Sequence, residues 1–157
     1  MEYIVHSVEE THNIAKQVAE KLKGQEIILL NGDLGAGKTT FTKGLAKALG
    51  IDDVVTSPTF TFMKEYNGRL NLYHFDMYRV EEADELYELG LNDYLGMEGG
   101  VCVIEWNKFE GIKNPIIIDI EVIDDNTRKI TINENTNNWC NITKTCSGSI
   151  WRKQSFI

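Results

Sequence analysis

The sequence predicts an α/β protein of three layers, in which a central parallel sheet carries additional antiparallel strands at its flanks. Two short apolar runs, Ile27-Ile28-Leu29-Leu30 and Val101-Cys102-Val103-Ile104, indicate strands that are buried on both faces, as in the middle of a parallel sheet. Helical and hairpin patterns alternate with these runs along the chain. This order of elements is typical of a sheet that is covered by helices.

Further patterns predict helices before and after the first of these strands. The residues Ser7-Val8-Glu9-Glu10 have the form of a capping box, and apolar residues at helical spacing follow them until Gly24. A second helix is expected from about Lys38 to Leu49, closed by Gly50. A third, acidic helix is expected from about Glu81 to Leu89, with two side chains directed inward: Leu86 and Leu89.

Two hairpins complete the predicted sheet. The strands Phe60–Tyr66 and Arg69–Phe75 flank Asn67-Gly68, a dipeptide that is typical of a two-residue hairpin turn. The two last strands, Ile116–Ile123 and Thr127–Ile132, are joined by a short polar turn. These pairs supply the antiparallel flanks of the sheet.

The chain of 157 residues has the composition of one globular domain, with 42% hydrophobic and 25% charged residues. No apolar run approaches the ~20 residues of a membrane span, and the glutamates near the N-terminus are unlike a signal peptide. We therefore expect a cytoplasmic protein with a single domain over residues 1–157. The segment 134–157, rich in Asn, Thr and Ser, is expected to form an atypical tail whose aromatic residues either pin it to the body or contact a partner.

The net charge of −8 is unevenly distributed along the chain. Residues 137–157 carry +3, so the first 136 residues carry −11. A body this acidic repels the phosphate backbone of a nucleic acid. Independent binding to nucleic acid is therefore not expected, whereas docking on a protein partner remains open.

The segment that carries the chemistry follows the first buried strand. Residues 32–39, here called the glycine-rich loop, read Gly-Asp-Leu-Gly-Ala-Gly-Lys-Thr and match the P-loop pattern Gly-x4-Gly-Lys-Thr. Glycines let backbone N–H groups turn toward one anion, and the N-terminus of the following helix adds partial positive charge. In such a loop Lys38 would contact the β- and γ-phosphates, and the Thr39 hydroxyl would bind Mg²⁺. The sequence therefore predicts a P-loop NTPase-like sandwich.

A P-loop site needs a second acid that holds Mg²⁺ and orients the attacking water. In open α/β sheets this acid belongs at the C-terminal end of a neighbouring buried strand. Glu105 follows the apolar run 101–104 and best fits this position, and Asp76 ends the strand before it. The residues alone do not decide which of the two acids orients the water. The guanine-specificity motif Asn/Thr-Lys-x-Asp does not follow Glu105, so a GTPase is not expected.

Four motifs in this order make the chain resemble the TsaE (formerly YjeE) family. They are the glycine-rich loop with Thr40-Phe41 after it, and three later segments: Ser57-Pro58-Thr59-Phe60-Thr61, Tyr73-His74-Phe75-Asp76-Met77-Tyr78-Arg79 and Glu105-Trp106. The similarity runs from about residue 7 to 133. The family consists of bacterial ATPases of tRNA threonylcarbamoyladenosine biosynthesis.

The resemblance implies a function that depends on partners. The isolated protein would hydrolyse ATP slowly, and its activity would depend on a complex with TsaD and TsaB. That complex attaches threonylcarbamoyl to the adenosine beside the anticodon, so this chain would meet tRNA only indirectly. ATP would be spent on resetting the complex between rounds. The implied cofactors are ATP and Mg²⁺.

The resemblance also implies roles for particular residues. Lys38, Asp76 and Glu105 would be catalytic, and Glu105 would hold Mg²⁺ together with Thr39. Thr11 and Arg128 match positions that lie near the adenosine in the family. The remaining nucleotide-binding residues belong to the glycine-rich loop and the start of the following helix: Asp33, Gly35, Ala36, Gly37 and Thr40.

Two other functions remain open from the residues themselves. One is a small P-loop kinase, a class that usually carries an arginine-rich lid, whereas this chain has only four arginines. The other is a nucleotide-gated binding module with negligible catalysis. Transfer of the γ-phosphate to an acceptor other than water would identify the first, and a nucleotide-dependent change in partner affinity without turnover would identify the second.

Overall fold

The computed structural model describes residues 1–58 and 60–134. In this part of the chain the strands are β1 (Glu2–Val5), β2 (Ile27–Asn31), β3 (Met63–Tyr66), β4 (Asn71–Asp76), β5 (Gly100–Glu105), β6 (Ile116–Asp124) and β7 (Thr127–Asn133). The helices are α1 (Val8–Lys21), α2 (Lys38–Ala48), α3 (Asp84–Glu88) and the 3₁₀ helix η1 (Leu91–Tyr94). The predicted tail lies outside the described residues, apart from Glu134.

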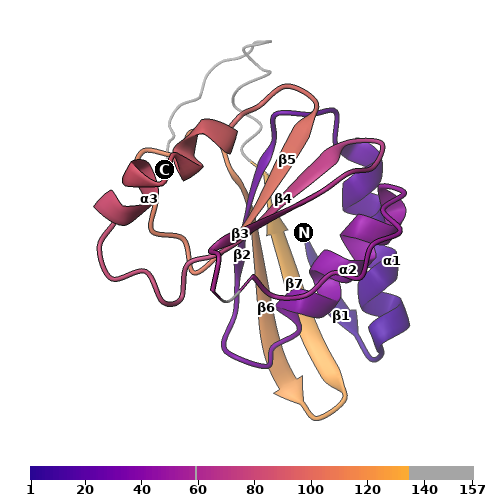
Figure 1. Ribbon diagram of the computed structural model, residues 1–157. Coiled ribbons are helices and arrows are strands. Elements are labelled where there is room, and N and C mark those ends of the chain that lie inside the picture. Colours follow the sequence, from indigo (N-terminus) through magenta and orange to yellow (C-terminus); the bar gives the residue numbers. More distant parts are fainter. Residues whose placement is uncertain (59, 135–157) are drawn as a thin grey trace, which may run out of the picture.

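All seven strands of the described part form one sheet in the order β1-β7-β6-β2-β5-β4-β3 (Figure 1). The strand β2 pairs in parallel with both β5 and β6, and β4 pairs in parallel with β5. Antiparallel pairs lie at the two flanks, with β3 on β4 at one side and β7 between β6 and β1 at the other. The predicted α/β class, with a parallel centre and antiparallel flanks, is confirmed.

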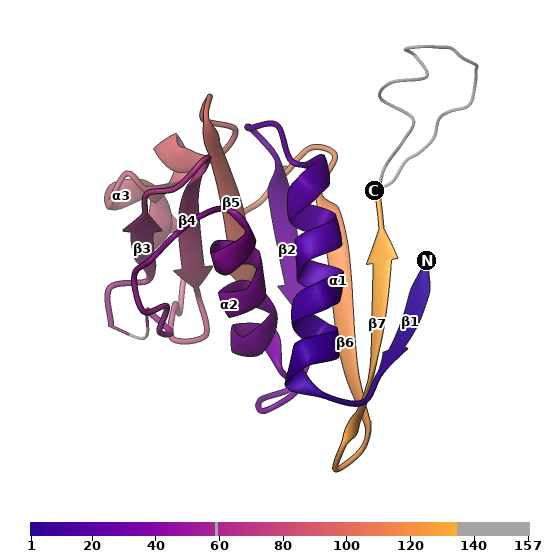
Figure 2. The same cartoon turned by 90° about the vertical axis from the view of Figure 1, so that its right-hand side faces the viewer.

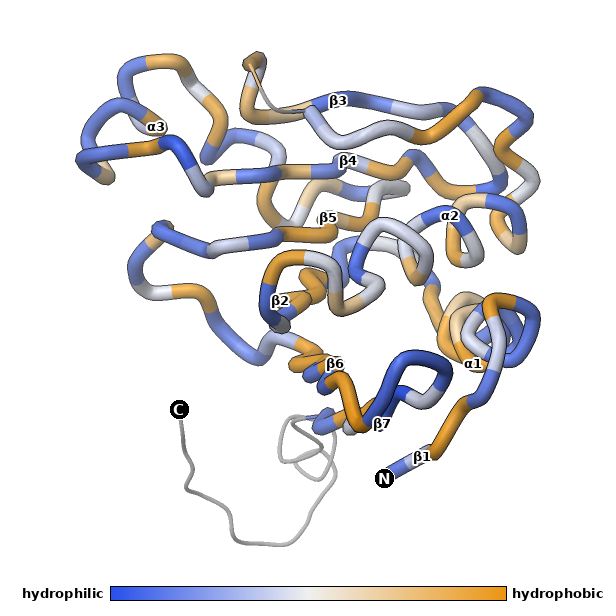
Figure 3. Tube along the Cα trace, turned by 90° about the horizontal axis from the view of Figure 1, so that it is seen from below, coloured by the Kyte–Doolittle hydropathy of each residue, from blue (hydrophilic) through white to orange (hydrophobic). Residues whose placement is uncertain are grey.

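Two apolar cores cover the two faces of the sheet. Alternate residues of β2 divide between them, because Ile28 and Leu30 pack in one core and Ile27 and Leu29 against the other. The helices α1 and α2 lie side by side over the first face, and α3 with η1 lies over the second (Figure 2). Hydrophobic chain segments gather along β2, β5 and β6 in the middle of the molecule (Figure 3). The central strands are therefore buried on both faces, as predicted.

The helix α1 begins where the capping box predicts. The Ser7 hydroxyl accepts a hydrogen bond from the Glu10 amide at 3.1 Å, and the Glu10 carboxylate accepts one from the His6 amide at 3.0 Å. The strand β1, which precedes the helix, was not predicted. It is an edge strand in which only Val5 is buried, so it lacks a continuous apolar signal.

The prediction of a two-residue turn at Asn67-Gly68 is wrong. The strand register pairs Tyr66 with Leu72, so the connection is longer than two residues. A Cβ atom on Gly68 would lie 2.4 Å from the Leu49 carbonyl oxygen, and the next amide, of Arg69, donates to the same oxygen at 2.7 Å. The glycine is therefore required by the close approach of this loop to the end of α2.

The acidic helix is shorter than predicted, and the prediction that both Leu86 and Leu89 face inward is wrong for Leu89. The side chain of Leu86 is fully buried, whereas Leu89 is 61% exposed. The helix α3 ends at Glu88, and Gly90 then turns the chain with a φ of 73°. Leu89 is the C-cap residue after the last residue of α3, and it is not held on the face that buries Leu86.

None of the described helices is long and apolar enough to cross a membrane.

We expect Gly44→Ala to lower the free energy of unfolding by about 1–3 kcal/mol, because a new Cβ atom would overpack the contact between α1 and α2. That atom would lie 2.9 Å from the His12 Cα atom. Helix propensity acts in the opposite direction and favours alanine by about 1 kcal/mol. Urea unfolding measures the difference, and Lys47→Ala, on the exposed side of α2, is the control. A more stable Gly44→Ala variant would contradict the packing argument.

Candidate functional site

The parallel register brings three chemically active segments to one edge of the sheet. Glu105, the last residue of β5, pairs with Leu30 of β2 on one side and with Asp76 of β4 on the other. The glycine-rich loop leaves β2 at Asn31, immediately after that pairing. The loop and both predicted acids therefore lie at the carboxyl ends of neighbouring parallel strands, where open α/β sheets place their ligands.

The glycine-rich loop leads directly into α2. Gly37 is the N-cap of the helix with a φ of 112°, and Gly35 has a φ of 80°. Because Gly37 has no side chain, it cannot bond the amides of the first helical turn, and these remain donors for an anion. At the other end of the loop, a Cβ atom on Gly32 would lie 2.7 Å from the Ile120 carbonyl oxygen, so the loop packs closely against β6.

The ammonium group of Lys38 is buried against its own loop. It donates hydrogen bonds to the carbonyl oxygens of Gly32 and, at 3.2 Å, of Asp33. It also lies 4.2 Å from the centroid of the Trp106 ring, a cation–π contact. Trp106 follows Glu105 and adopts a φ of 55°, and its ring packs edge-on against Tyr78 at 5.0 Å. The Trp106 indole therefore connects the end of β5 to the glycine-rich loop.

The two predicted acids lie in different surroundings. Glu105 is 4% exposed, and its Oε2 atom lies 2.6 Å from Nε2 of the fully buried His74. Asp76 is half-buried, and its carboxylate accepts hydrogen bonds from the Ser57 hydroxyl at 2.8 Å and from the Tyr78 amide at 3.0 Å. The first acid is held by a buried partner, and the second by groups at the surface.

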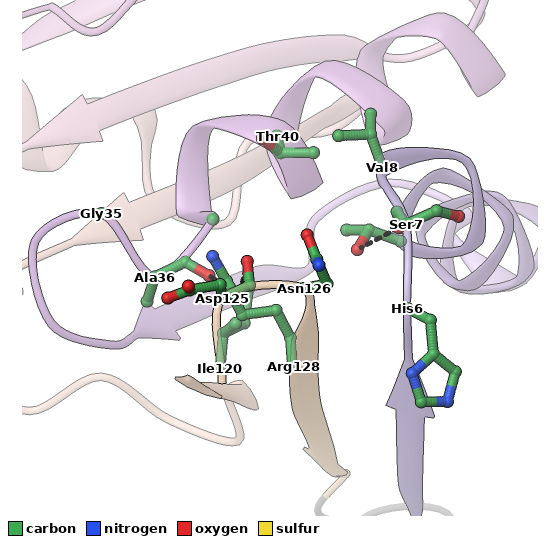
Figure 4. Close-up of a pocket in the computed structure, with 12 residues that line it drawn as sticks. His6, Ser7, Val8, Gly35, Ala36, Thr40, Ile120, Asp125, Asn126 and Arg128 are labelled. Atoms are coloured by element: carbon green, nitrogen blue, oxygen red, sulfur yellow. Dashed lines mark hydrogen bonds between the residues drawn. The ribbon is translucent and has the colours of Figure 1, made fainter. Parts of the chain in front are cut away.

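A pocket of about 230 Å³ opens on the other side of the glycine-rich loop (Figure 4). It brings together six of the residues that the sequence predicted for the nucleotide: Thr11, Gly35, Ala36, Gly37, Thr40 and Arg128. Thr39 lies half-buried in the first turn of α2 and does not line this pocket. Asp33 lines a separate surface pocket of about 410 Å³ with residues of β6.

Arg128 ties the glycine-rich loop to the turn between β6 and β7. Its Nε atom donates to the Ala36 carbonyl oxygen at 3.1 Å, and its Nη1 atom donates to the Asp124 carbonyl oxygen at 2.8 Å. The pKa of the Asp124 carboxyl is held below its usual value, chiefly because the Asn126 amide donates a hydrogen bond to it. The turn therefore carries a fixed negative charge beside the pocket.

Sequence reasoning missed half of the residues that line this pocket: His6, Ser7, Val8, Ile120, Asp125 and Asn126. Three of them precede or begin α1, and their position depends on the unpredicted strand β1. The others come from β6 and from the turn that follows it. The signal that could have found them is the pairing of the first strand with the last, which places the start of α1 beside that turn.

Other residues of the four motifs lie close to the site or at the surface. His74 of β4 is fully buried and faces Glu105. The guanidinium carbon of Arg79 lies 5.3 Å from the centroid of the Phe60 ring. Among the described residues no ion pair joins Arg79 to the acidic segment 81–88. Thr59, which belongs to the second of the four motifs, lies outside the described residues.

Comparison with known proteins identifies the family. Residues 5–136 match the sequence model of the family described as threonylcarbamoyl adenosine biosynthesis protein TsaE. The tRNA threonylcarbamoyladenosine biosynthesis protein TsaE of Treponema pallidum is 38% identical over 135 residues, which cover 84% of this chain and 99% of that protein. The protein of the same name from Aquifex aeolicus is 42% identical over 134 residues, which cover 83% and 94%.

Two similar proteins come from Bacillus subtilis. Its TsaE protein is 56% identical over 99 residues, which cover 62% of this chain and 61% of that protein. The crystal structure of its YdiB protein superposes with a TM-score of 0.73 at 40% identity and covers 85% of this chain and 84% of that one. Sequence and fold therefore agree, and this chain belongs to the TsaE family of threonylcarbamoyladenosine biosynthesis proteins.

Proposed function

We propose that this chain binds Mg-ATP at the glycine-rich loop and hydrolyses it to support turnover of a tRNA-modifying complex with TsaD and TsaB. The observation that carries the proposal is the convergence of four groups at one sheet edge. They are the buried Lys38, the free amides at the start of α2, and the carboxylates of Asp76 and Glu105. These are the groups that phosphoryl transfer to water requires.

The donors around the loop fit both implied cofactors. A triphosphate would take Lys38 and the amides of the loop as its partners, and its adenosine would lie in the pocket that Thr11 and Arg128 line. The Thr39 hydroxyl and the Glu105 carboxylate are oxygen donors of the kind that Mg²⁺ prefers. Bound there, Mg²⁺ would neutralise charge on the phosphates.

Asp76 is the better placed of the two acids to orient the attacking water. Its carboxylate is half-buried at the mouth of the site and is held by an exposed hydroxyl and a backbone amide. A water molecule can therefore reach the Asp76 carboxylate and donate a hydrogen bond to it. A lone pair of the water oxygen would then be free to attack the γ-phosphorus. The proton leaves with the inorganic phosphate or passes to the carboxylate, and ADP is the leaving group.

We expect Lys38→Ala to lower ATP turnover by about 10²–10³-fold, because the developing charge on the phosphates loses its fixed partner. Phosphate release is measured with the TsaD and TsaB partners present. Lys43→Ala, on the exposed side of the same helix, is the matched control and should keep the wild-type rate. Turnover that survives in Lys38→Ala, or its absence from the wild-type protein with both partners, would overturn the proposed hydrolysis.

Arg128→Ala should raise the dissociation constant of a non-hydrolysable ATP analogue by about 10-fold. The variant loses the hydrogen bond that holds the Ala36 carbonyl oxygen, so the glycine-rich loop is less preorganised for the nucleotide, and a tenfold change corresponds to about 1.4 kcal/mol. Isothermal titration calorimetry measures the change. Lys129→Ala is the control, because this neighbouring cation makes only a 3.6 Å ion pair with Glu2 at the surface. Equal affinities in the two variants would remove Arg128 from the nucleotide site.

Association with TsaD and TsaB should depend on the nucleotide that is present. We expect different affinities with ATP and with ADP, because the loop and the acids beside it contact the γ-phosphate only in the triphosphate. Surface plasmon resonance with the immobilised partner complex measures both states. Lys38→Ala should lose the difference. If the γ-phosphate moved to an acceptor other than water, the chain would be a kinase instead.

A further inference from the structure

We propose that His74 is a positioning residue, whose Nε2–H group holds one carboxylate oxygen of Glu105 so that the other is presented to bound Mg-ATP. The inference rests on the proposed function and adds to it the group that orients the buried acid. The supporting observations are the direction of the side chains on two neighbouring strands, the short contact between them and their burial.

The strand geometry places the histidine and both acids on one face of the sheet. His74 and Asp76 are two residues apart on β4, so their side chains project from the same face. Asp76 pairs with Glu105 across the parallel ladder, and the apolar neighbours Leu72 and Val103 belong to the core beneath α1 and α2. This is the face from which α2 and the glycine-rich loop cover the sheet.

The contact between His74 and Glu105 is short and is buried away from solvent. The atoms Nε2 of His74 and Oε2 of Glu105 lie 2.6 Å apart, and the side chains are 0% and 5% exposed. A carboxylate that is so far removed from water requires a strong hydrogen-bond donor. The imidazole supplies one, and a charge-assisted hydrogen bond of this kind fixes the plane of the carboxylate.

The surroundings of Nδ1 identify which ring nitrogen of His74 carries the proton. Within the described part of the chain, Nδ1 of His74 is buried and has no hydrogen-bond partner. A proton on Nδ1 would leave a buried donor unpaired, at a cost of about 1–3 kcal/mol. A proton on Nε2 is instead donated to the carboxylate. The geometry therefore assigns the Nε2–H tautomer, with Glu105 as the acceptor.

This hydrogen bond gives the two oxygen atoms of the Glu105 carboxylate different roles. It occupies Oε2, and no hydrogen bond within the described part of the chain involves Oε1, so Oε1 is the atom that would bind the metal. The next residue, Trp106, contacts Lys38, so the end of β5 lies against the glycine-rich loop. Carboxylates that bind metals are themselves oriented by hydrogen bonds from neighbouring groups, and loss of such a support costs about 10–100-fold in metal affinity or activity.

The experiment compares His74→Leu with His74→Gln. The leucine variant removes the donor, and the glutamine variant keeps a side-chain N–H group that can reach the same carboxylate. Binding of Mn²⁺ is followed by electron paramagnetic resonance in the presence of a non-hydrolysable ATP analogue. We expect His74→Leu to weaken Mn²⁺ binding by about 10–100-fold and to lower kcat similarly, with little change in KM for ATP at saturating metal. His74→Gln should recover most of both.

A matched variant separates positioning from simple loss of stability. Val103→Ala opens a cavity beneath α2 at the residue that pairs with His74, and it leaves the Glu105 contact in place. Urea unfolding measures the stability of every variant. Val103→Ala is expected to lose stability while it keeps wild-type Mn²⁺ affinity and kcat.

The outcomes distinguish this inference from the proposed function. If the wild-type protein binds Mn²⁺ with the nucleotide and His74→Leu binds it equally well, His74 does not position Glu105, and the proposed ATPase stands. If Mn²⁺ affinity falls only in proportion to stability, with His74→Gln and Val103→Ala on the same line as His74→Leu, the histidine is structural and the inference is overturned. If the wild-type protein itself binds no Mn²⁺ with the nucleotide and hydrolyses no ATP, the proposed function fails first.

Discussion

The parallel register of β2, β5 and β4 is the constraint on which the rest of the structure depends. It sets Leu30, Glu105 and Asp76 side by side, so the loop that leaves β2 and the two acids meet at one edge. The register is itself set by burial, because both faces of these strands face an apolar core. A slip by one residue would turn His74 and Glu105 toward the opposite core, where apolar side chains are packed. The packing of the two apolar cores therefore positions the glycine-rich loop and the two acids.

Sequence predicted the elements that carry a continuous physical signal. The central strands are apolar on both faces, and α1 has a capping serine, so their existence and order were predictable. The glycine-rich loop was predictable because its residue types match a recognised pattern between a buried strand and a helix. The acids Asp76 and Glu105 were predictable as strand ends, since the carboxyl ends of parallel strands meet.

Features that depend on long-range contacts were not predictable in the same way. Gly68 was interpreted as a turn residue, but its function is to let the loop approach the Leu49 carbonyl oxygen. The burial of His74 follows from its place on the face of the sheet that α1 and α2 cover, and the contact with Glu105 follows from the register. The turn residues Asp125 and Asn126 reach the pocket only because β1 pairs with β7. A single sequence carries no local signal for any of these contacts.

The contacts of Lys38 have a thermodynamic consequence for any ligand of this loop. The ammonium group is already paired with the carbonyl oxygens of Gly32 and Asp33 and with the indole of Trp106. A phosphate must exchange these internal partners for its own oxygens, and the carbonyl groups must then find new donors. Affinity is therefore a difference between two paired states, as in an ion-exchange equilibrium, and is lower than the phosphate contacts alone would give. A loop built in this way would bind a phosphate group reversibly and could release it again.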